Sequence, residues 1–511
     1  IQNKIKLTSA KSSVDNSPVL VVNNSPQNFD FSNQGDQEEN NDKPEIPNNL
    51  PSTHLAIVTG HFDLMQEFLA NQSRVTAAFY SRENTNAIES RTFADSYPFL
   101  GKIIESDSEH LLAERFFDLN QDVFLQDHTL GGKVSQRHPE LYPLPVIPFT
   151  FSMEIIAEAA TYLVGGDNFV VGLDHLRGYR WLALDQGQLL LQISAKILPR
   201  QDTTTCDVYV QLFQSLATES GQILVFEGYV RLANQLPSAR ISQTFILESS
   251  APSQSSDQDL YRKGMFHGRR LQGVKHIRQW SKQGMEAELE VLPLDDFFTN
   301  IQHPIFKTDA GLLDAAGQLV GYWLTEQFGP DVNCFPFQIK AFRQYAEPLP
   351  AGSKILCRAF IEFISSSQIQ AQFELLDENG KVIASLSEWT DRYYTVPHNF
   401  YQCRLQPQTS YLSTAWMQSD IGLVCRRIEP FPKHFLDDSW GIWKRVLAHL
   451  MLNQAERNFW YQLPEKGERR TDWLLGRIAA KEALRQWAKQ TFNLDLASAD
   501  IEILPNNLGK P

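Results

Sequence analysis

The sequence is poor in cysteine and has no long apolar run. Its five cysteines are scattered over 511 residues, with no C-x-x-C pair and no zinc-ligand spacing. We therefore expect reduced, mostly buried thiols rather than a disulfide framework or a zinc site. No apolar run is long enough to cross a bilayer, and the first residues lack a basic-then-apolar secretion signal. These absences predict a soluble, cytoplasmic protein without a membrane span.

Basic residues are also the minority among the charged ones. The chain has 46 Lys and Arg against 60 Asp and Glu, which gives a formal net charge of -14. Such a balance argues against a nucleic-acid partner and does not suggest an anionic membrane surface. A length of 511 residues exceeds what one core normally covers, so we expect two or three domains.

The first part of the chain has the composition of a linker. Residues 1–50 are rich in Asn, Ser, Gln, Asp and Pro, and their low apolar content predicts a disordered interdomain linker. Within residues 51–94, apolar side chains recur at near-helical spacing after Ser52 and Thr53, two residues that can cap a helix. This pattern predicts a helical linker or docking segment, and a loosely held surface helix fits it equally well.

The most informative stretch runs from Phe124 to Ala160. His128 can take a proton near neutral pH, and Gly131 and Gly132 just after it allow the backbone a close approach to a ligand. Residues 152–163 follow with an apolar face at helical spacing. We therefore expect a base beside an apolar helix at the wall of a binding pocket.

The same plan of one helix followed by antiparallel strands occurs twice. Alternating apolar residues predict strands over 189–197 and 206–212, after the helix at 152–163. A second apolar helix face spans 312–323, and strands follow at 354–364, 368–376 and 381–394. The turn D-E-N-G joins the last two strands as a hairpin. The fold class is therefore α+β, and the repetition predicts a pseudo-dimer.

Two motifs resemble those of a known family. The segments D-H-T-L-G-G and L-P-V-I-P-F-T-F-S-M-E resemble the first hotdog of the dehydratase domains in polyketide and polyunsaturated fatty acid synthases. The resemblance implies a tandem, or double, hotdog with its active site between an N-terminal hotdog at 95–250 and a C-terminal hotdog at 251–400. It also implies dehydration of a 3-hydroxyacyl thioester on an acyl carrier protein, which brings its own phosphopantetheine arm. No cofactor or metal is implied. The partners would be the carrier protein and neighbouring synthase domains, and a homodimer is compatible with the family.

The resemblance assigns the catalytic residues. His128 takes the place of the family's base, although Arg137 stands where its motif has a proline. The segment H-P-I-F-K-T-D-A-G-L-L-D-A-A-G-Q is similar to the stretch that supplies the acid, which maps to Asp314 with Gln318 as its companion. Asp309, nearer the helix start, is a competing acid but is more simply explained as a helix cap.

A second motif resembles the family's entry into the second hotdog. It is Y-R-K-G-M-F-H-G-R-R-L-Q-G-V, with its glycines at Gly268 and Gly273. His267 lies within it and could approach the site, but we expect a structural role for it at the start of a strand.

Dehydration independently requires two groups of this kind. One takes a proton from C2 and another gives a proton to the departing C3 hydroxyl. Asp314 and Gln318 are four residues apart on one helix face, and apolar neighbours favour a raised pKa and a protonated Asp314. We expect N–H groups near Gly131 or Gly132 to polarise the thioester carbonyl, and the resemblance adds Pro148 and Gly268 to the substrate site. Enoyl isomerisation between C2 and C4 needs the same groups and stays open. A non-catalytic scaffold that docks carrier proteins is disfavoured by having both His128 and Asp314.

The remaining residues, 401–511, differ in composition from the preceding segments. Residues 439–452 and 469–487 read as amphipathic helices, and the second, with the closing E-I-L-P-N-N-L-G-K-P, is similar to the N-terminal part of phosphopantetheinyl transferases. The resemblance places Arg477 and Lys481 near the phosphates of coenzyme A. The acidic magnesium motif comes later in that family, so Glu482 is not part of it, and we expect a truncated segment without transferase activity. A simple helical subdomain is the alternative. Because the sequence starts at Ile1 and stops at G-K-P, we expect a fragment of a larger synthase.

Overall fold

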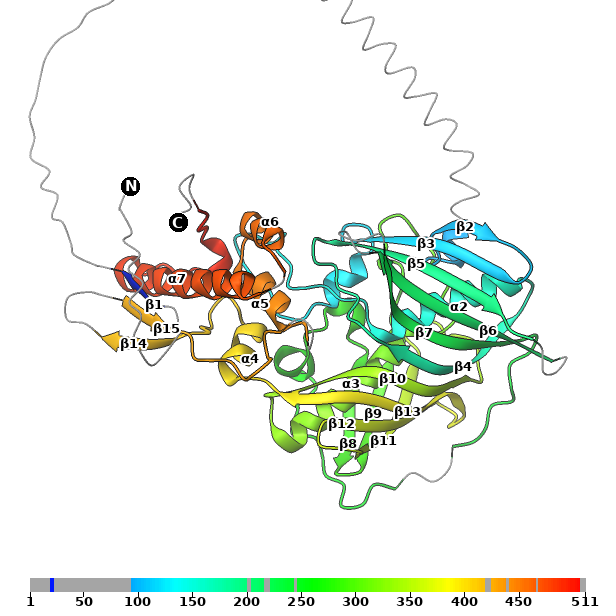
Figure 1. Ribbon diagram of the computed structural model, residues 1–511. Helices are drawn as coiled ribbons and strands as arrows, with labels where there is room; N and C mark the ends of the chain where they lie inside the picture. The colour runs from blue at the N-terminus through cyan, green and yellow to red at the C-terminus, as the bar shows by residue number, and fades with distance from the viewer. Residues whose placement is uncertain are drawn as a thin grey trace, which may run out of the picture. The chain divides into compact units, whose positions relative to one another are not determined.

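The computed structural model describes residues 19–22, 93–199, 204–215, 221–242, 246–418, 424–437, 441–465 and 467–505 (Figure 1). Most of the predicted linker and nearly all of the segment at 51–94 lie outside these residues. One part of the linker prediction is wrong, because Val19–Val22 form strand β1. β1 pairs antiparallel with β15 (Val424–Arg427) of the C-terminal segment. Its sequence V-L-V-V is the apolar, β-branched kind that favours a strand.

The chain then builds the same unit twice. Each unit contains two strands, a long helix and four further strands in that order. The first unit consists of β2 (Lys102–Ser106), β3 (His110–Asp118), η1 (Val123–Asp127), α2 (Phe149–Val164), β4 (Phe169–Gly178), β5 (Gln188–Ile197), β6 (Thr205–Ser215) and β7 (Gln222–Ala233). The second consists of η2 (Leu260–Gly264), η3 (Arg269–Leu271), β8 (Val274–Ser281), β9 (Gly284–Glu290), α3 (Ala310–Phe328), β10 (Val332–Gln344), β11 (Lys354–Phe363), β12 (Gln368–Leu376) and β13 (Val382–Thr395).

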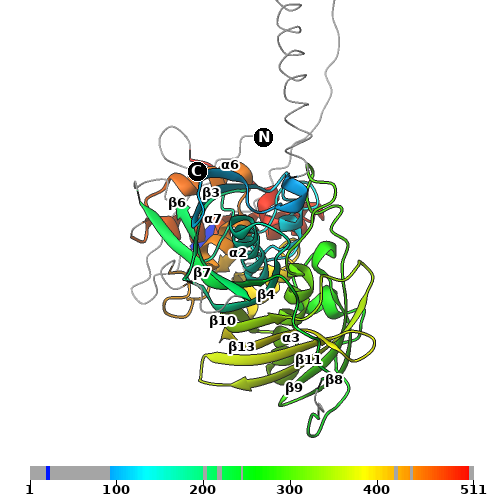
Figure 2. The same cartoon turned by 90° about the vertical axis from the view of Figure 1, so that its right-hand side faces the viewer.

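The two units share one 12-stranded antiparallel sheet. Its order is β2-β3-β5-β6-β7-β4-β10-β13-β12-β11-β9-β8, so the second half repeats the first in reverse about the β4–β10 seam. Arg343 of β10 reinforces the seam by donating to Asp174 of β4 at 2.7 Å. Helix α2 packs against β4–β7, and α3 packs against β8–β11 (Figure 2). The predicted tandem hotdog, with each helix wrapped by a curved sheet, is confirmed by this topology.

Both central helices have clear local start and stop signals. α2 follows Pro148, whose φ of −59° suits a helix entry, and α3 follows Asp309, whose carboxylate accepts from Leu312 N at 2.9 Å. Asp309 is therefore a helix cap, as the sequence indicates. Gly165 and Gly329 end the two helices at φ +67° and +82°, a backbone conformation that favours glycine.

The C-terminal segment packs onto the first hotdog as part of the same compact unit. Residues of the loop between His128 and α2 share one apolar core with α5 and α7, including Leu130, Val134, Leu144, Val446 and Ile478. Polar contacts cross the same boundary, such as Arg445 to Asp185 at 3.1 Å. The elements of this segment are α4 (His398–Leu405), β14 (Thr414–Gln418), β15, α5 (Trp443–Met451), α6 (Gln454–Gln462), α7 (Arg469–Phe492) and η4 (Ser498–Asp500).

No helix within the described ranges has the length and apolar character needed to cross a bilayer.

Candidate active site

His128 lies at the end of η1, where the first hotdog meets the second. Its backbone forms an isolated antiparallel bridge with His267. The ring Nδ1 lies 2.7 Å from the carbonyl oxygen of Val146. Because a carbonyl only accepts, Nδ1 carries the hydrogen and Nε2 keeps its lone pair. The loop thus fixes the tautomer that a general base requires.

Asp314 projects from α3 and is held by its neighbour one turn later. Gln318 Nε2 donates to Asp314 Oδ2 at 2.9 Å and to the Leu271 carbonyl at 3.0 Å. The hydroxyl of Tyr261 donates to Gln318 Oε1 at 2.8 Å and accepts from Val274 N at 2.8 Å. The expected pairing of Asp314 with Gln318 is therefore present, and Tyr261 fixes the orientation of the amide.

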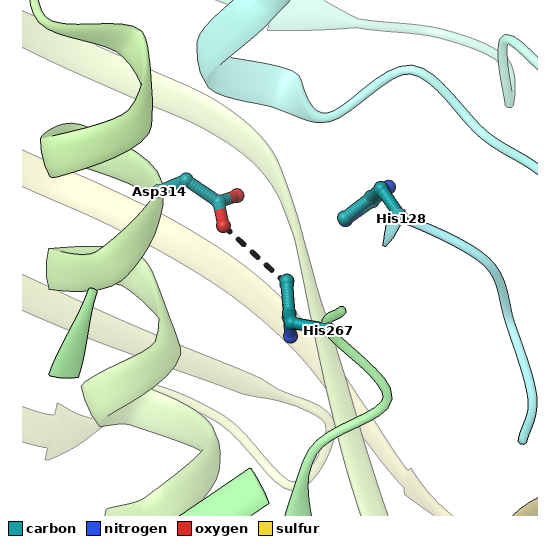
Figure 3. Close-up of side chains that lie close together, drawn as sticks. All are labelled: His128, His267 and Asp314. Carbon is teal, nitrogen blue, oxygen red and sulfur yellow. Dashed lines mark ion pairs between the residues drawn. The ribbon is translucent and has the colours of Figure 1, made fainter. Parts of the chain in front are cut away.

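His267 is a site residue that sequence reasoning placed outside the site. Its Nε2 lies 3.3 Å from Asp314 Oδ2, and its ring centroid lies 5.1 Å from that of His128 (Figure 3). The motif M-F-H-G allows this histidine to approach the site, although its position before a strand favours a structural role. The pairing that brings it there, between the backbones of residues 128 and 267, joins segments of the two hotdogs and leaves no local signal.

The three side chains form a compact polar cluster at the junction of the two halves. His128, His267 and Asp314 each offer one polar atom, and all three atoms lie within 4.8 Å of one another. In Figure 3 the side chains converge from three separate elements. A cluster of this size can share a proton, a substrate oxygen or a cation.

The surroundings set the protonation of the cluster. Burial, reinforced by the nearby His267, lowers the pKa of His128 to about 4, so the ring is neutral near pH 7. Burial alone would raise the pKa of Asp314, but His267, His128 and the Gln318 amide outweigh it and hold that pKa below its ordinary value. The expectation of a raised pKa for Asp314 was wrong, because it considered the apolar neighbours on α3 and not the histidine from another element.

A cavity of about 470 Å³ opens beside this cluster. His128, Pro148, His267, Asp314 and Gln318 all line it. Its other walls are largely apolar and aromatic, which is typical of a site for a small molecule. The C-terminal segment supplies part of the lining, namely Pro432, Lys433, His434, Phe435, Gly441, Ile442 and Trp443.

The predicted glycines have packing roles instead of facing the cavity. Gly132 N donates to the Arg404 carbonyl at 2.7 Å, so the expected donor to a thioester carbonyl is already engaged. A Cβ at Gly131 would lie 2.6 Å from Leu450 Cδ2. A Cβ at Gly268 would lie 2.0 Å from Asp127 Oδ1, so this glycine allows the chain at His267 to approach the η1 loop. None of the three lines the cavity, so the structure supports neither an oxyanion role for Gly131 and Gly132 nor a substrate contact for Gly268.

The start of α2 offers other donors at the cavity. Phe149 and Thr150 line it, and the first N–H groups of an α-helix have no partner within the helix. Thr150 Oγ1 is buried and has no hydrogen-bond partner among the described residues.

Asp391 also lines the cavity and was missed by sequence reasoning. Burial raises its pKa to about 7, and its side chain accepts from Trp389 Nε1 at 2.6 Å.

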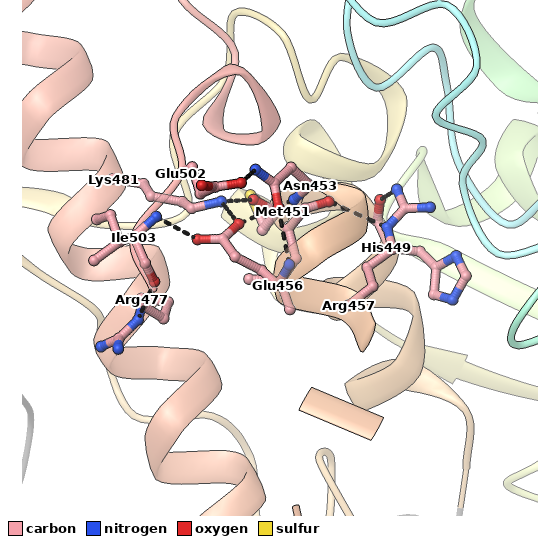
Figure 4. Close-up of polar contacts among 10 residues, drawn as sticks. His449, Met451, Asn453, Glu456, Arg457, Arg477, Lys481, Glu502 and Ile503 are labelled. Carbon is pink, nitrogen blue, oxygen red and sulfur yellow. Dashed lines mark hydrogen bonds and ion pairs between the residues drawn. The ribbon is translucent and has the colours of Figure 1, made fainter. Parts of the chain in front are cut away.

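Arg477 and Lys481, the residues assigned to coenzyme A binding, lie on α7 and do not line this cavity. Lys481 is fully buried, pairs with Glu456 and donates to the Met451 carbonyl at 2.9 Å, while Arg477 donates to the Ile503 carbonyl at 2.8 Å (Figure 4). Burial lowers the pKa of Lys481 to about 8 despite its partner. Glu482 accepts from Leu412 N and Ser413 N at 2.7 and 2.8 Å. Lys481 thus forms a buried ion pair with Glu456, and the structure does not support a phosphate contact for it.

Strand order and the cluster at the seam define the class of protein as a double hotdog with a candidate acid–base site between its halves. Residues 243–398 match the model of the family described as polyketide synthase dehydratase N-terminal domain. That range is less than half of the chain; it covers the second hotdog with His267 and Asp314 and leaves out His128. No curated protein matches the sequence.

Solved structures of dehydratase domains are similar to this chain at low identity. The dehydratase domain from the CurF module of curacin polyketide synthase has 16% identity, covers 59% of this chain and 99% of its own length, and gives a TM-score of 0.45. The dehydratase domain of RzxB from Pseudomonas fluorescens has 14% identity over 58% of this chain and 98% of its own, with a TM-score of 0.43. A trans-AT polyketide synthase dehydratase domain from Brevibacillus brevis has 17% identity over 58% and 98%, with a TM-score of 0.44. Likeness at this level carries no information on the reaction.

Proposed function

We propose that the double hotdog removes water from a 3-hydroxyacyl thioester on an acyl carrier protein to give a trans-2-enoyl thioester, within a polyketide or fatty acid synthase of the cytoplasm. The observation that carries this proposal is the convergence of His128 and Asp314, one from each hotdog, on one cavity with their polar atoms within 4.8 Å. The family match over residues 243–398 points to the same reaction.

His128 is the base in this proposal. Its Nε2 takes the C2 proton, which is acidified by the thioester carbonyl. Because the pKa of His128 is lowered to about 4, the ring is free to accept a proton at neutral pH. The contact between Nδ1 and the Val146 carbonyl keeps the lone pair on Nε2 and stabilises the imidazolium that forms.

The side chain of Asp314 faces the departing C3 hydroxyl. Gln318 holds one carboxylate oxygen, which leaves the other for the substrate. The thioester carbonyl is assigned to the start of α2, where Thr150 has a buried hydroxyl with no partner among the described residues. A hydrogen bond to the carbonyl oxygen stabilises the enolate-like charge that develops as C2 loses its proton.

The decisive experiment is mass spectrometry of a 3-hydroxyacyl carrier protein after incubation with the wild type, His128→Ala and Asp314→Asn. Loss of one water with the wild type and with neither variant is expected. Migration of a double bond in a 2-enoyl substrate without any water loss would favour isomerisation. Absence of both reactions across several acyl lengths would leave a scaffold that docks carrier proteins.

The C-terminal segment is assigned a structural role in this proposal. Lys481 is buried in an ion pair, and part of the segment lines the cavity of the double hotdog. We therefore expect no transfer of phosphopantetheine from coenzyme A to a carrier protein. Transfer in a loading assay would overturn this assignment.

A further inference from the structure

We propose that His267 is a third working residue of this site: together with Asp314 it holds the proton that leaves with the C3 hydroxyl, and together with Gln318 it fixes which carboxylate oxygen faces the substrate. This inference rests on the proposed dehydration. It assigns His267 a positioning and proton-holding role that neither the family match nor the sequence motif supplies.

The first support is the way Asp314 is held. His267 Nε2 and Gln318 Nε2 approach the same oxygen, Oδ2, at 3.3 and 2.9 Å. The other oxygen, Oδ1, points toward the side of His128 in Figure 3. Two donors on one oxygen prevent the carboxylate from rotating, so the free oxygen is kept at the position where a C3 hydroxyl must lie between acid and base.

The second support is the environment of the His267 ring. The side chain is only 7% exposed and its ring stacks on Phe266 at a centroid distance of 4.6 Å. Gln272 donates to the His267 carbonyl at 2.9 Å, which fixes the backbone. Its Nδ1 is buried without a hydrogen-bond partner among the described residues. A buried histidine with a purely structural role would be expected to form hydrogen bonds with both ring nitrogens, whereas here Nε2 contacts the acid and Nδ1 has no partner among the described residues.

The third support comes from proton accounting. Because His267 and the other neighbours hold the pKa of Asp314 below its ordinary value, the carboxyl itself is ionised at neutral pH and has no proton to give. His267 lies 3.3 Å from Asp314. The proton can therefore be on His267, which gives an imidazolium beside a carboxylate, or on Asp314, which gives a neutral imidazole beside a carboxylic acid. Both forms have the same total charge. When two groups are coupled this closely, the proton belongs to the pair.

The step balances with the groups present. His128 Nε2 takes the C2 proton, the C2 electron pair forms the C2–C3 double bond, and the C3–O bond breaks with its electrons on oxygen. The oxygen takes the proton of the His267–Asp314 pair and leaves as water. His128 then holds one extra proton and the pair lacks one, so transfer of that proton across the cluster restores the starting state.

The charged groups near His267, among the residues that the structure describes, are retained when only this residue is substituted. Asp127 and Arg270 form an ion pair at 2.8 Å next to Gly268, His128 faces the ring from the η1 loop, and Arg404 lies over the Phe266 ring at 5.9 Å. On α3 the facing groups are Asp314 and the uncharged Gln318. All of these residues are kept in the variant. Because His267 also lowers the pKa of His128, its substitution changes the acidic limb of the pH profile as well, and the basic limb is the one that reports the His267–Asp314 pair.

The test compares His267→Gln with the wild type on a 3-hydroxyacyl carrier protein. The amide of glutamine can donate to Oδ2, but it cannot take a proton. We expect kcat to fall by about tenfold or more at pH 8 and less at pH 6, while KM changes by no more than about twofold, because general acid catalysis typically contributes 10²- to 10⁴-fold. The basic limb of the kcat profile should move to lower pH.

A second variant separates chemistry from folding. In His267→Ala, added imidazole should restore part of kcat in a concentration-dependent way, since the ring it replaces lines the cavity. Wild-type kcat and pH profile in His267→Gln, or no imidazole rescue in a folded His267→Ala, would overturn the inference while leaving the dehydratase intact. If the wild type itself releases no water, the proposed function and this inference fall together.

Discussion

The two central helices carry polar pairs at the same spacing and put them to different uses. α2 has Glu154 and Glu158, and α3 has Asp314 and Gln318, each pair four residues apart. Glu154 accepts from Thr308 N and Oγ1 at 2.7 and 2.6 Å and thereby ties the first hotdog to the start of α3. Glu158 accepts from Phe99 N at 2.7 Å. Neither glutamate lines the cavity, whereas both residues of the α3 pair do.

The difference shows that environment, more than residue type, decides the role of a buried acid. Burial raises the pKa of Glu154 to about 7, and burial together with Glu154 raises the pKa of Glu158 well above its ordinary value. Asp314 is less completely buried, with 12% of its side chain exposed, and a histidine from another element lowers its pKa. One helix thus holds its partner segments through hydrogen bonds to carboxyl groups, and the other presents a carboxyl group to the cavity.

The largest effect on kcat is expected when Asp314, in the polar pair of α3, is replaced. Asp314→Asn should lower kcat by about 10²- to 10⁴-fold, because it removes the group that faces the leaving hydroxyl. Asp309→Asn is the matched control on the same helix, since asparagine is as good a helix cap as aspartate and Asp309 is not a lining residue. The measurement is the rate of water loss in each variant. If both variants lost activity to the same extent, the acid would be a residue other than Asp314.

The α2 pair should affect stability more than rate. Glu154→Leu leaves two backbone N–H groups and one hydroxyl without their acceptor, and each buried unsatisfied group costs about 1–3 kcal/mol. We expect a loss of several kcal/mol in urea unfolding, with Glu154→Gln markedly less affected. Folded Glu154→Leu with a large fall in kcat would contradict the division of roles.

Stability should also depend on pH through Glu154. Its pKa is raised in the folded state, so this carboxyl favours folding most below the ordinary value of 4.5, and the contribution is lost as pH rises toward about 7. The slope for one such group is at most about 1.4 kcal/mol per pH unit. Urea unfolding between pH 5 and pH 8 should show a shallower decline for Glu154→Gln than for the wild type. Parallel curves would mean that Glu154 is already ionised.

The smallest effect is expected at Glu158. Burial and the nearby Glu154 raise the pKa of Glu158 well above its ordinary value, which favours the protonated carboxyl, a group that resembles an amide. Glu158→Gln keeps an acceptor for Phe99 N, so its unfolding free energy should differ from the wild type by less than about 1 kcal/mol. A larger loss at pH 7 would indicate a charged Glu158 and weaken the contrast between the helices.

The sequence was sufficient for whatever depends on local pattern. Alternation predicted β5 and β6, helical spacing predicted α2 and α3, and the spacing of Asp314 and Gln318 put both on one face. Contacts between distant segments were not accessible, because the pairing of residue 128 with residue 267 and of Lys481 with Glu456 follows from topology. The same limit explains why the direction of the pKa shift of Asp314 was predicted wrongly. It also explains the oxyanion role given to Gly132, because its N–H donates to the carbonyl of Arg404, a residue distant in the sequence.

The way the C-terminal segment packs has a practical consequence for cutting and grafting this protein. The chain between Val396 and Phe400 looks like a natural boundary, yet the loop that leads from His128 to α2 shares its apolar core with α5 and α7. A cut there would expose that core and remove Phe435 and Trp443 from the wall of the cavity. A graft into another protein should therefore carry residues 94–505 together with strand β1, which pairs with β15, and the cuts should lie outside these elements.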